Sequence, residues 1–289
     1  MKTLFVSPHT DDAALSCGGR IVALRDAGED VAIVTIFSGS GPGDALTPYQ
    51  RDALGFGFRP EAAGRAGPTE PAEPAEPTEP AEAPSPFEAM ELRRREDRAY
   101  ARFVGAIARH LDVPDAVFRD YQGDDQLIGT PRPDDPAPVD RLRDAIREIR
   151  PDRVCFPLAV GSHVDHRLAR RAGMELLAAG DVAPEIVRFY EDFPYSRNVG
   201  FTGLADLDAE FAAALPASLT LEPELVAIDA TIDRKIAGLE CYRSQLGNLF
   251  GGNDPMAAAV RERAAFLGGS AAAERYWRPV PRTRTAASS

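Results

Sequence analysis

TLFVSPHTDDAALSCGGRIVALRDAGEDVAIVTIF, residues 3–37, is the stretch that decides the fold of this chain. Residues 3–8 and 31–37 are short, largely apolar runs, which are typical of strands buried on both faces. Between them, apolar side chains recur at helical spacing from Leu15 to Leu24, and Gly28 is placed to end the helix. A strand–helix–strand unit implies a parallel sheet with helices on both faces. We therefore predict an α/β protein: a three-layer, Rossmann-like fold with a mostly parallel sheet.

The rest of the chain continues this alternation of helices and strands. Helical periodicity runs over residues 90–111 and over the amphipathic segment 138–150, which leads into a strand at 153–159. We further predict a strand over 116–121, a helix from about 165 to 179, a strand over 185–192 and two later helical stretches. No large repeat interrupts this order, so one domain over residues 1–283 is the simplest organisation.

One segment departs from the alternation. Residues 67–86 read GPTEPAEPAEPTEPAEAPSP, an (Ala/Thr)-Glu-Pro repeat with five Glu and no basic residue. Proline removes amide donors and the like charges repel each other, so such a segment is extended and solvated. We predict a disordered Glu-Pro-rich insertion at about residues 60–88, with a Pro-rich docking site as the alternative, and a flexible tail over residues 284–289.

The composition is that of an acidic globular protein. There are 33 Lys and Arg against 45 Asp and Glu, a net charge of −12, which argues against a nucleic-acid partner. No apolar run approaches the roughly 20 residues needed to span a bilayer, and the N-terminal apolar region is too short for a signal peptide. Three Cys do not make a disulfide framework. We expect a cytoplasmic protein with no integral membrane segment, and its oligomeric state stays open.

Three of the four His lie in two clusters that follow predicted strands. His9 precedes Asp11 and Asp12 after the first strand, and GSHVDH, residues 161–166, follows the strand over 153–159. The carboxyl ends of parallel strands share one edge of a sheet, where ligands bind. Two imidazoles and a carboxylate around one ion, with a position left for water, make a catalytic metal site. A lone His is more often a hydrogen-bonded loop residue and an Asp pair more often caps a helix, but the joint pattern favours a metal site.

A second glycine-rich stretch does not predict a nucleotide site. GSGPG at residues 39–43 resembles a phosphate loop, but Asp44 stands where the third Gly of G-x-G-x-x-G would fall. The stretch also follows the second strand instead of the first. We therefore do not predict a dinucleotide cofactor.

Several motifs together resemble one known family. PHTDD at residues 8–12, LSCGG at 15–19 and HVDH at 163–166 are similar to the patterns of the PIG-L/LmbE-like zinc-dependent N-deacetylases. RRRED at 93–97, YEDFPY at 190–195 and YRSQ at 242–245 resemble family patterns of lower specificity, so the resemblance covers most of the chain. Ala13 stands where many members carry Glu, which weakens substrate assignment by analogy and leaves the metal ligands unaffected.

The resemblance implies a role for each residue of the two His-Asp motifs. The metal ligands would be His9, Asp12 and His166, holding Zn²⁺, with Fe²⁺ or another divalent transition metal as the alternative. Asp11 would be the general base that activates water, because a carboxylate beside the metal can take its proton. His163, in its protonated form, would stabilise the oxyanion, and Asp165 would orient a histidine.

Three weaker candidates for substrate binding lie outside these motifs. Arg93 begins an R-x-x-E pattern with Glu96, and Asp115 and Tyr195 lie in the segments LDVPDA and YEDFPY. The competing interpretation of each is an ordinary exposed or loop residue. His110, at the end of the helix predicted over 90–111, is expected to be a capping or surface residue.

The sequence thus predicts a metal-dependent amide hydrolase. It would use metal-activated water to remove an N-acetyl group from an N-acetylglucosamine-type or other amino-sugar conjugate, giving acetate and a free amine. One alternative is an amidase of a thiol–sugar conjugate, and a second is a catalytically silent sugar-binding protein. The partner would be a small molecule or glycoconjugate whose aglycone the sequence does not identify.

Overall fold

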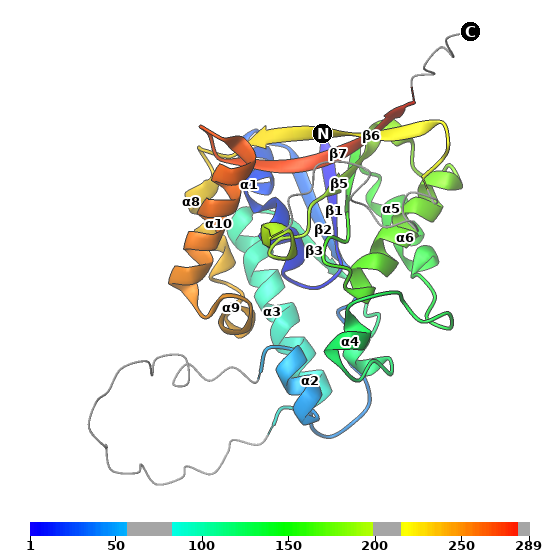
Figure 1. The fold of residues 1–289 in the computed structure, drawn as a ribbon, viewed down its shortest axis with the longest axis vertical. Coiled ribbons are helices and arrows are strands. Elements are labelled where there is room, and N and C mark those ends of the chain that lie inside the picture. The colour runs from blue at the N-terminus through cyan, green and yellow to red at the C-terminus, as the bar shows by residue number, and fades with distance from the viewer. Residues whose placement is uncertain (57–82, 199–214, 283–289) are drawn as a thin grey trace.

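A seven-stranded sheet forms the centre of the computed structural model, which describes residues 1–56, 83–198 and 215–282 (Figure 1). The strand order is β3–β2–β1–β4–β5–β7–β6, in which β3 to β5 pair in parallel and β7 and β6 are antiparallel. The strands are β1 (Lys2–Ser7), β2 (Asp30–Thr35), β3 (Ile107–His110), β4 (Arg153–Pro157), β5 (Val187–Tyr190), β6 (Leu219–Ala227) and β7 (Ala273–Pro281). The predicted α/β fold with a mostly parallel sheet is confirmed.

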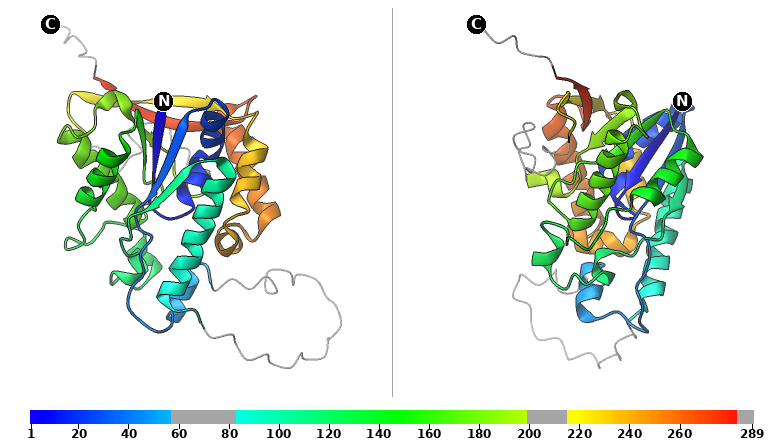
Figure 2. Two further views of the ribbon diagram at one scale, coloured as in Figure 1. Left: turned by 180° about the vertical axis from the view of Figure 1, so that it is seen from behind. Right: turned by 90° about the vertical axis from the view of Figure 1, so that its right-hand side faces the viewer.

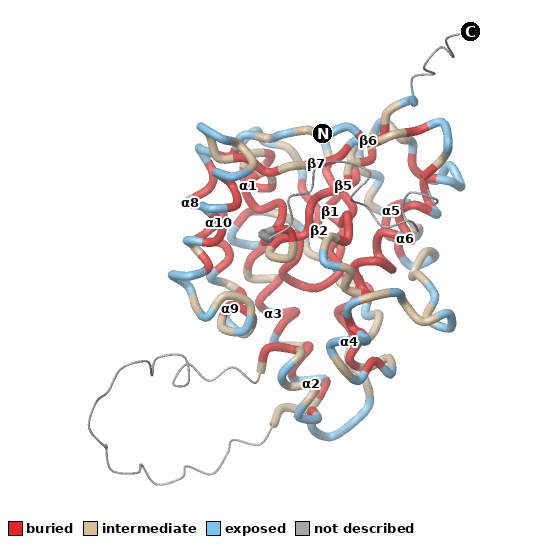
Figure 3. Tube along the Cα trace, viewed as in Figure 1, coloured by how far each residue is buried: buried red, intermediate tan, exposed pale blue. Residues whose placement is uncertain are grey.

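Helices cover both faces of the sheet and complete the three layers (Figure 2). One face carries α1 (Asp12–Asp26), α3 (Pro86–Val104), α8 (Ile232–Leu239), α9 (Arg243–Phe250) and α10 (Asn253–Gly268), and the other carries α5 (Val139–Ile149) and α6 (Val164–Ala178). Successive strand residues point to opposite faces. Phe5 and Ile33 therefore enter the core under α1, whereas Leu4 and Val34 enter the core under α6. Figure 3 shows the buried residues concentrated along these two interfaces.

Short helices lie beyond the carboxyl ends of the parallel strands. They are α2 (Pro48–Ala53), α4 (Asp124–Leu127) and the 3₁₀ helices η2 (Ala116–Phe118) and η4 (Tyr195–Asn198), with η3 (Pro184–Ile186) preceding β5. Leu54, Tyr121 and Leu127 bury one another in a third apolar cluster there. Figure 1 places α2 and α4 together at the lower end of the molecule. This cluster frames the sheet edge toward which β1 and β4 run.

The glycine pair of LSCGG lies within α1 and permits close packing. A Cβ at Gly19 would lie 2.7 Å from Cγ2 of Ile228, in the segment that leads into α8. Thr231 closes the same contact, because its Oγ1 donates a hydrogen bond to the carbonyl oxygen of Gly19 at 2.9 Å. Only glycine allows this approach without displacing α8.

The helix predicted over 90–111 is wrong at both ends. α3 begins at Pro86, where Ser85 and Glu88 form a capping box. It ends at Val104, because Gly105 takes a left-handed conformation with φ of 75°. Residues 107–110 then pair with β2 as a strand. The helical spacing of apolar residues continues past Gly105, although this glycine ends the helix.

His110 consequently ends a strand, and the predicted surface or capping role is wrong. Its Nε2 lies 2.8 Å from Oδ2 of Asp97, and its side chain is largely buried. The fully buried Asp97 also accepts hydrogen bonds from Thr35 and Tyr242. Asp97 therefore ties α3 to β2, β3 and the segment before α9.

Two further predictions differ from the structure. Residues 116–121 form no strand, because the carboxylate of Asp115 accepts a hydrogen bond from the amide of Val117 and starts η2. The C-terminal part contains the long antiparallel pair of β6 and β7 besides its helices, and the sequence interpretation missed both strands. The remaining predicted elements are confirmed within a few residues as α1, α5, α6, β1, β2, β4 and β5.

Most of the predicted insertion at about residues 60–88, namely residues 60–82, and the predicted tail lie outside the described residues. Residues 86–88, at the C-terminal end of the predicted insertion, belong to α3. Within the described ranges, no helix combines the length and the apolar character needed to cross a membrane.

Candidate metal and catalytic site

The two His-Asp motifs meet at one edge of the sheet. β1 leads through His9 and Asp11 into α1, which begins at Asp12. Its parallel neighbour β4 leads through His163 into α6, which begins at Val164. The predicted convergence of the clusters is thus a consequence of adjacent parallel strands that end at the same level.

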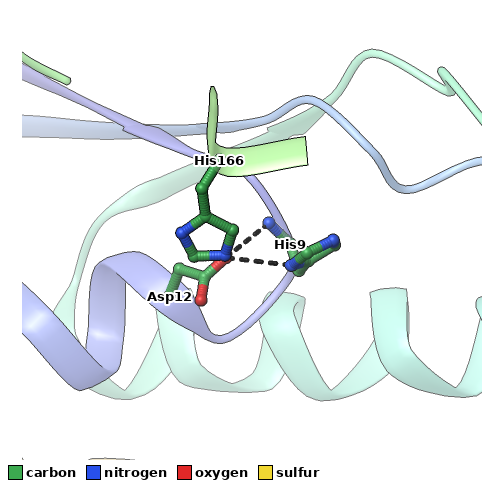
Figure 4. Close-up of side chains that lie close together, drawn as sticks. All are labelled: His9, Asp12 and His166. Carbon is green, nitrogen blue, oxygen red and sulfur yellow. Dashed lines mark hydrogen bonds and ion pairs between the residues drawn. The ribbon is translucent and has the colours of Figure 1, made fainter. Parts of the chain in front are cut away.

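His9, Asp12 and His166 bring three donor atoms together. Oδ2 of Asp12 lies 3.2 Å from Nδ1 of His9 and 3.2 Å from Nε2 of His166. All three residues are buried, and their donor atoms lie within 4.8 Å of one another, as one metal ion requires. Figure 4 shows the three side chains converging from the β1–α1 loop, α1 and α6. The donor set of two imidazoles and one carboxylate suits a divalent transition metal.

A carboxylate holds the far nitrogen of each histidine. Nε2 of His9 lies 3.0 Å from Oδ2 of Asp165, and Nδ1 of His166 lies 2.6 Å from Oδ1 of Asp192. Such carboxylate–histidine pairs fix the ring orientation and tautomer of metal ligands. Nδ1 of His9 and Nε2 of His166 are thereby directed at Asp12. Nε2 of His166 is buried and makes no hydrogen bond among the described residues, so its lone pair fits a metal ion.

Sequence reasoning missed Asp192 and Arg119. Asp192 follows β5, the next parallel strand, within YEDFPY, so its position at a strand end was the available signal. Arg119 contacts Oδ1 of Asp165 and binds Asp135 at 3.0 Å, and its guanidinium lies over the ring of Phe37. No motif near Arg119 indicated a role for it, and its segment was predicted to be a strand.

The charges of the cluster favour a cation at its centre. Burial opposes charge on His9, but Asp12 and Asp165 outweigh it and hold the pKa of His9 well above its usual value. His166 behaves alike: burial is outweighed by Asp12 and Asp192, which raise its pKa to about 9. The two imidazoliums in turn hold the pKa of Asp12 well below its usual value, despite its burial. The same carboxylates that favour positive charge on the two imidazoles would favour a divalent cation between them.

Asp11 stands beside the cluster with different properties. It is buried at the start of α1, and Oδ1 lies 3.9 Å from Nη2 of Arg93. Burial and the neighbouring charge of Asp12 raise the pKa of Asp11 to about 6, while Arg93 opposes the shift. A carboxyl group with a pKa near neutrality can both accept and return a proton.

His163 differs from the predicted protonated form. Its ring meets the ring of His9 edge-on, with the centroids 4.9 Å apart. The backbone amide of Asp165 donates a hydrogen bond to Nδ1 of His163 at 3.2 Å, so that nitrogen carries no proton. Burial and the adjacent His9 also lower the pKa of His163 to about 3. A neutral His163 remains able to donate through Nε2.

The cluster opens into a cavity of about 560 Å³. Arg93, Asp115 and Tyr195, the predicted substrate-binding residues, all line it together with His9, Asp11, Asp12 and His163. Nη1 of Arg93 lies 3.6 Å from Asp115, and the ring of Tyr195 meets the ring of His166 edge-on. Glu96 does not line the cavity; it accepts two hydrogen bonds from Ser244 instead. The structure thus places the candidate residues together, while their roles stay predictions.

GSGPG takes no part in this cavity. The amide of Gly39 donates to the carbonyl oxygen of Val113 at 2.9 Å, and a Cβ at Gly39 would lie 2.5 Å from the carbonyl oxygen of Asp112. Gly39 serves a close backbone approach between two loops.

Comparison with known proteins gives concordant matches. The family model described as "PIG-L: GlcNAc-PI de-N-acetylase" matches residues 4–177. A 2'-N-acetylparomamine deacetylase of Streptomyces fradiae is 28% identical over 97% of this chain and 90% of its own. The crystal structure of the A40926 pseudoaglycone deacetylase superposes with a TM-score of 0.69 at 25% identity, covering 97% of this chain and 98% of that one. A deacetylase of teicoplanin biosynthesis shares the fold with a TM-score of 0.73 at 23% identity, covering 99% and 100%.

Proposed function

The chain belongs to the PIG-L family, and from that premise we propose that it is a metal-dependent N-deacetylase of an N-acetylglucosamine-type or other amino-sugar conjugate. One observation carries the proposal. The buried His9–Asp12–His166 trio, each histidine held by its own carboxylate, stands beside a buried Asp11 at the base of a cavity large enough for a sugar.

We propose His9, Asp12 and His166 as the residues that hold the ion, with zinc favoured and Fe²⁺ or another divalent transition metal as the alternative. When bound, such an ion supplies Lewis acidity, which polarises a carbonyl group and lowers the pKa of water. Asp165 and Asp192 keep the two imidazoles in the orientation that directs Nδ1 of His9 and Nε2 of His166 toward Asp12.

Asp11 acts as the general base in this proposal. Its carboxylate accepts a proton from the attacking water and returns one to the departing nitrogen, which leaves as an amine while the acyl group leaves as acetate. His163 donates through Nε2 to the oxygen that becomes negative when the carbonyl carbon is attacked. Because Nδ1 of His163 accepts from the amide of Asp165, the imidazole is fixed in the tautomer that can do so.

The direct test is acetate release from a panel of N-acetylglucosamine glycosides. We expect equal amounts of acetate and free amine, loss of both with a chelator, and recovery with zinc or ferrous ion. Asp12→Asn is the control that should lose metal and turnover together. A protein free of metal by elemental analysis and indifferent to chelator would contradict the proposal. Thiol–sugar amides in the panel distinguish an amidase, and binding of the glycosides without any turnover distinguishes a silent sugar-binding protein.

A further inference from the structure

Carboxylates outnumber guanidinium and ammonium groups on the wall of the catalytic cavity. Among the described residues that line it, Asp11, Asp12, Asp52, Asp115 and Asp124 face one guanidinium, that of Arg93. A divalent ion in the proposed site would neutralise half of the negative excess and leave the rest. The cavity therefore keeps a net negative charge when the metal ion is bound. The proposed reaction gives no role to part of this charge.

The carboxylates unrelated to the metal cluster lie at the mouth of the cavity. Asp52 on α2 and Asp124 on α4 are exposed, and neither has an ion-pair partner among the described residues. Burial, followed by Asp124, Asp115 and, least of the three, Asp125, raises the pKa of Tyr49 to about 12, as expected in a field of negative charge. Both carboxylates line the cavity, and within the described ranges neither side chain makes a hydrogen bond or ion pair.

The deep part of the cavity favours a ligand group of different chemistry, one that accepts hydrogen bonds. Arg93 is only 5% exposed, and its Nε has no hydrogen-bond partner. Its Nη atoms stand 3.6 Å and 3.9 Å from Asp115 and Asp11, beyond normal hydrogen-bond length. A buried guanidinium whose Nε has no hydrogen-bond partner points to ligand oxygen atoms. The cavity thus matches a molecule with oxygen acceptors at its inner end and positive charge at its outer end.

A second cavity, of about 480 Å³, continues beyond Tyr49 and Val117, which line both. Its described lining includes the rings of Phe118 and Tyr121 and no basic residue; Asp120 is its one charged group. The ligand therefore has room to extend past a single sugar, and the extension meets no positive charge on this wall.

Resting on the proposed deacetylase function, we propose that the substrate carries at least one free ammonium group besides its acetamide, and that Asp52 and Asp124 bind it at the mouth of the cavity. The substrate class is thus an amino-sugar conjugate that is already cationic before deacetylation. A neutral N-acetylglucosaminide would use the same inner site without this attraction.

The test compares two N-acetylglucosamine glycosides that differ in one group: an aminopropyl and a hydroxypropyl glycoside. At low ionic strength the wild-type enzyme should prefer the amine about fivefold or more in kcat/KM, through KM, as two exposed ion pairs allow. The Asp52→Asn, Asp124→Asn double variant should reduce that preference to about one and leave kcat on the hydroxypropyl glycoside unchanged. Salt of about 0.5 M should weaken the wild-type preference.

Asp125→Asn is the matched control, because Asp125 neighbours Asp124 on α4, carries the same charge and does not line the cavity. It should keep the preference. Equal kcat/KM of the wild type for the two glycosides, or a preference that survives in the double variant, overturns the inference. If neither glycoside releases acetate, the deacetylase proposal fails instead. Calorimetric titration of both glycosides then decides the inference: tighter binding of the amine, lost in the double variant, supports it, and equal binding overturns it.

Discussion

Replacing Asp11 by Asn should separate catalysis from metal binding and from stability. The substitution keeps size and polarity and removes the basic carboxylate. If Asp11 is the general base, kcat should fall by on the order of 10²–10⁴-fold while the metal content stays that of the wild type. Asp12→Asn, one residue away, should instead lose the ion, because Oδ2 of Asp12 faces both histidines.

Although Asp11→Asn should lower kcat, it should raise the free energy of unfolding of the metal-free protein. Burial and Asp12 raise the pKa of Asp11 from 3.8 to about 6. Between these pH values the folded protein holds a proton that the unfolded chain has released, so the free energy of unfolding falls as the pH rises. At about 1.4 kcal/mol per pH unit, the ionised Asp11 costs up to about 3 kcal/mol at pH 7. Asn carries no charge, so the metal-free variant should gain up to that amount, a few degrees in Tm.

Three measurements on the same preparations test this reasoning: kcat, metal content by elemental analysis, and thermal unfolding at pH 5 and pH 7 in chelator. The gain in Tm of Asp11→Asn should be larger at pH 7. The acidic limb of the wild-type pH–rate profile should lie at or below pH 6, since a bound cation favours the carboxylate, and it should change in the variant. Near-wild-type kcat, loss of metal, or a metal-free variant less stable than the wild type at pH 7 would each refute the assignment.

Two further outcomes are expected. Asp192→Asn should weaken metal affinity by about 10- to 100-fold, measured by competition with a chelator, because Asp192 orients His166 through Nδ1; unchanged affinity would remove it from the metal site. Deletion of residues 67–82 should leave Tm and turnover nearly unchanged. A longer deletion, through residue 86, should lower the free energy of unfolding by about 1 kcal/mol, because it removes the Ser85 cap of α3. A large loss of turnover in the shorter deletion would assign the segment a catalytic role.

The sequence predicted the fold where the signal was local. Apolar runs located β1, β2 and β4, and the strand–helix order of residues 3–37 implied the parallel sheet. The sequence analysis failed for segments whose conformation depends on pairing with another part of the folded chain. β3 has four residues and becomes a strand by pairing with β2. β6 and β7 stabilise each other through an antiparallel ladder between segments 45 or more residues apart, which no window of sequence can reveal.

The same limit explains which part of the candidate site could be predicted. His9 and Asp12 are three residues apart, so the start of α1 brings them together, and HVDH places His166 at the start of α6 in the same way. The residues that compensate the charge of these three ligands lie far away in the sequence, so no local motif reveals them.

Asp165 shows why that compensation matters and why it needs the folded chain. It is fully buried, and an isolated buried carboxylate is strongly disfavoured. His9, the amide of Ala116 and the guanidinium of Arg119 satisfy it together. These partners come from the β1–α1 loop and from η2, segments about 50 to 150 residues away in the chain. Arg119 and His9 hold the pKa of Asp165 well below its usual value, despite burial, so it stays charged and can keep His9 in one tautomer. The orientation of a predicted metal ligand thus depends on a salt bridge that only the tertiary structure assembles.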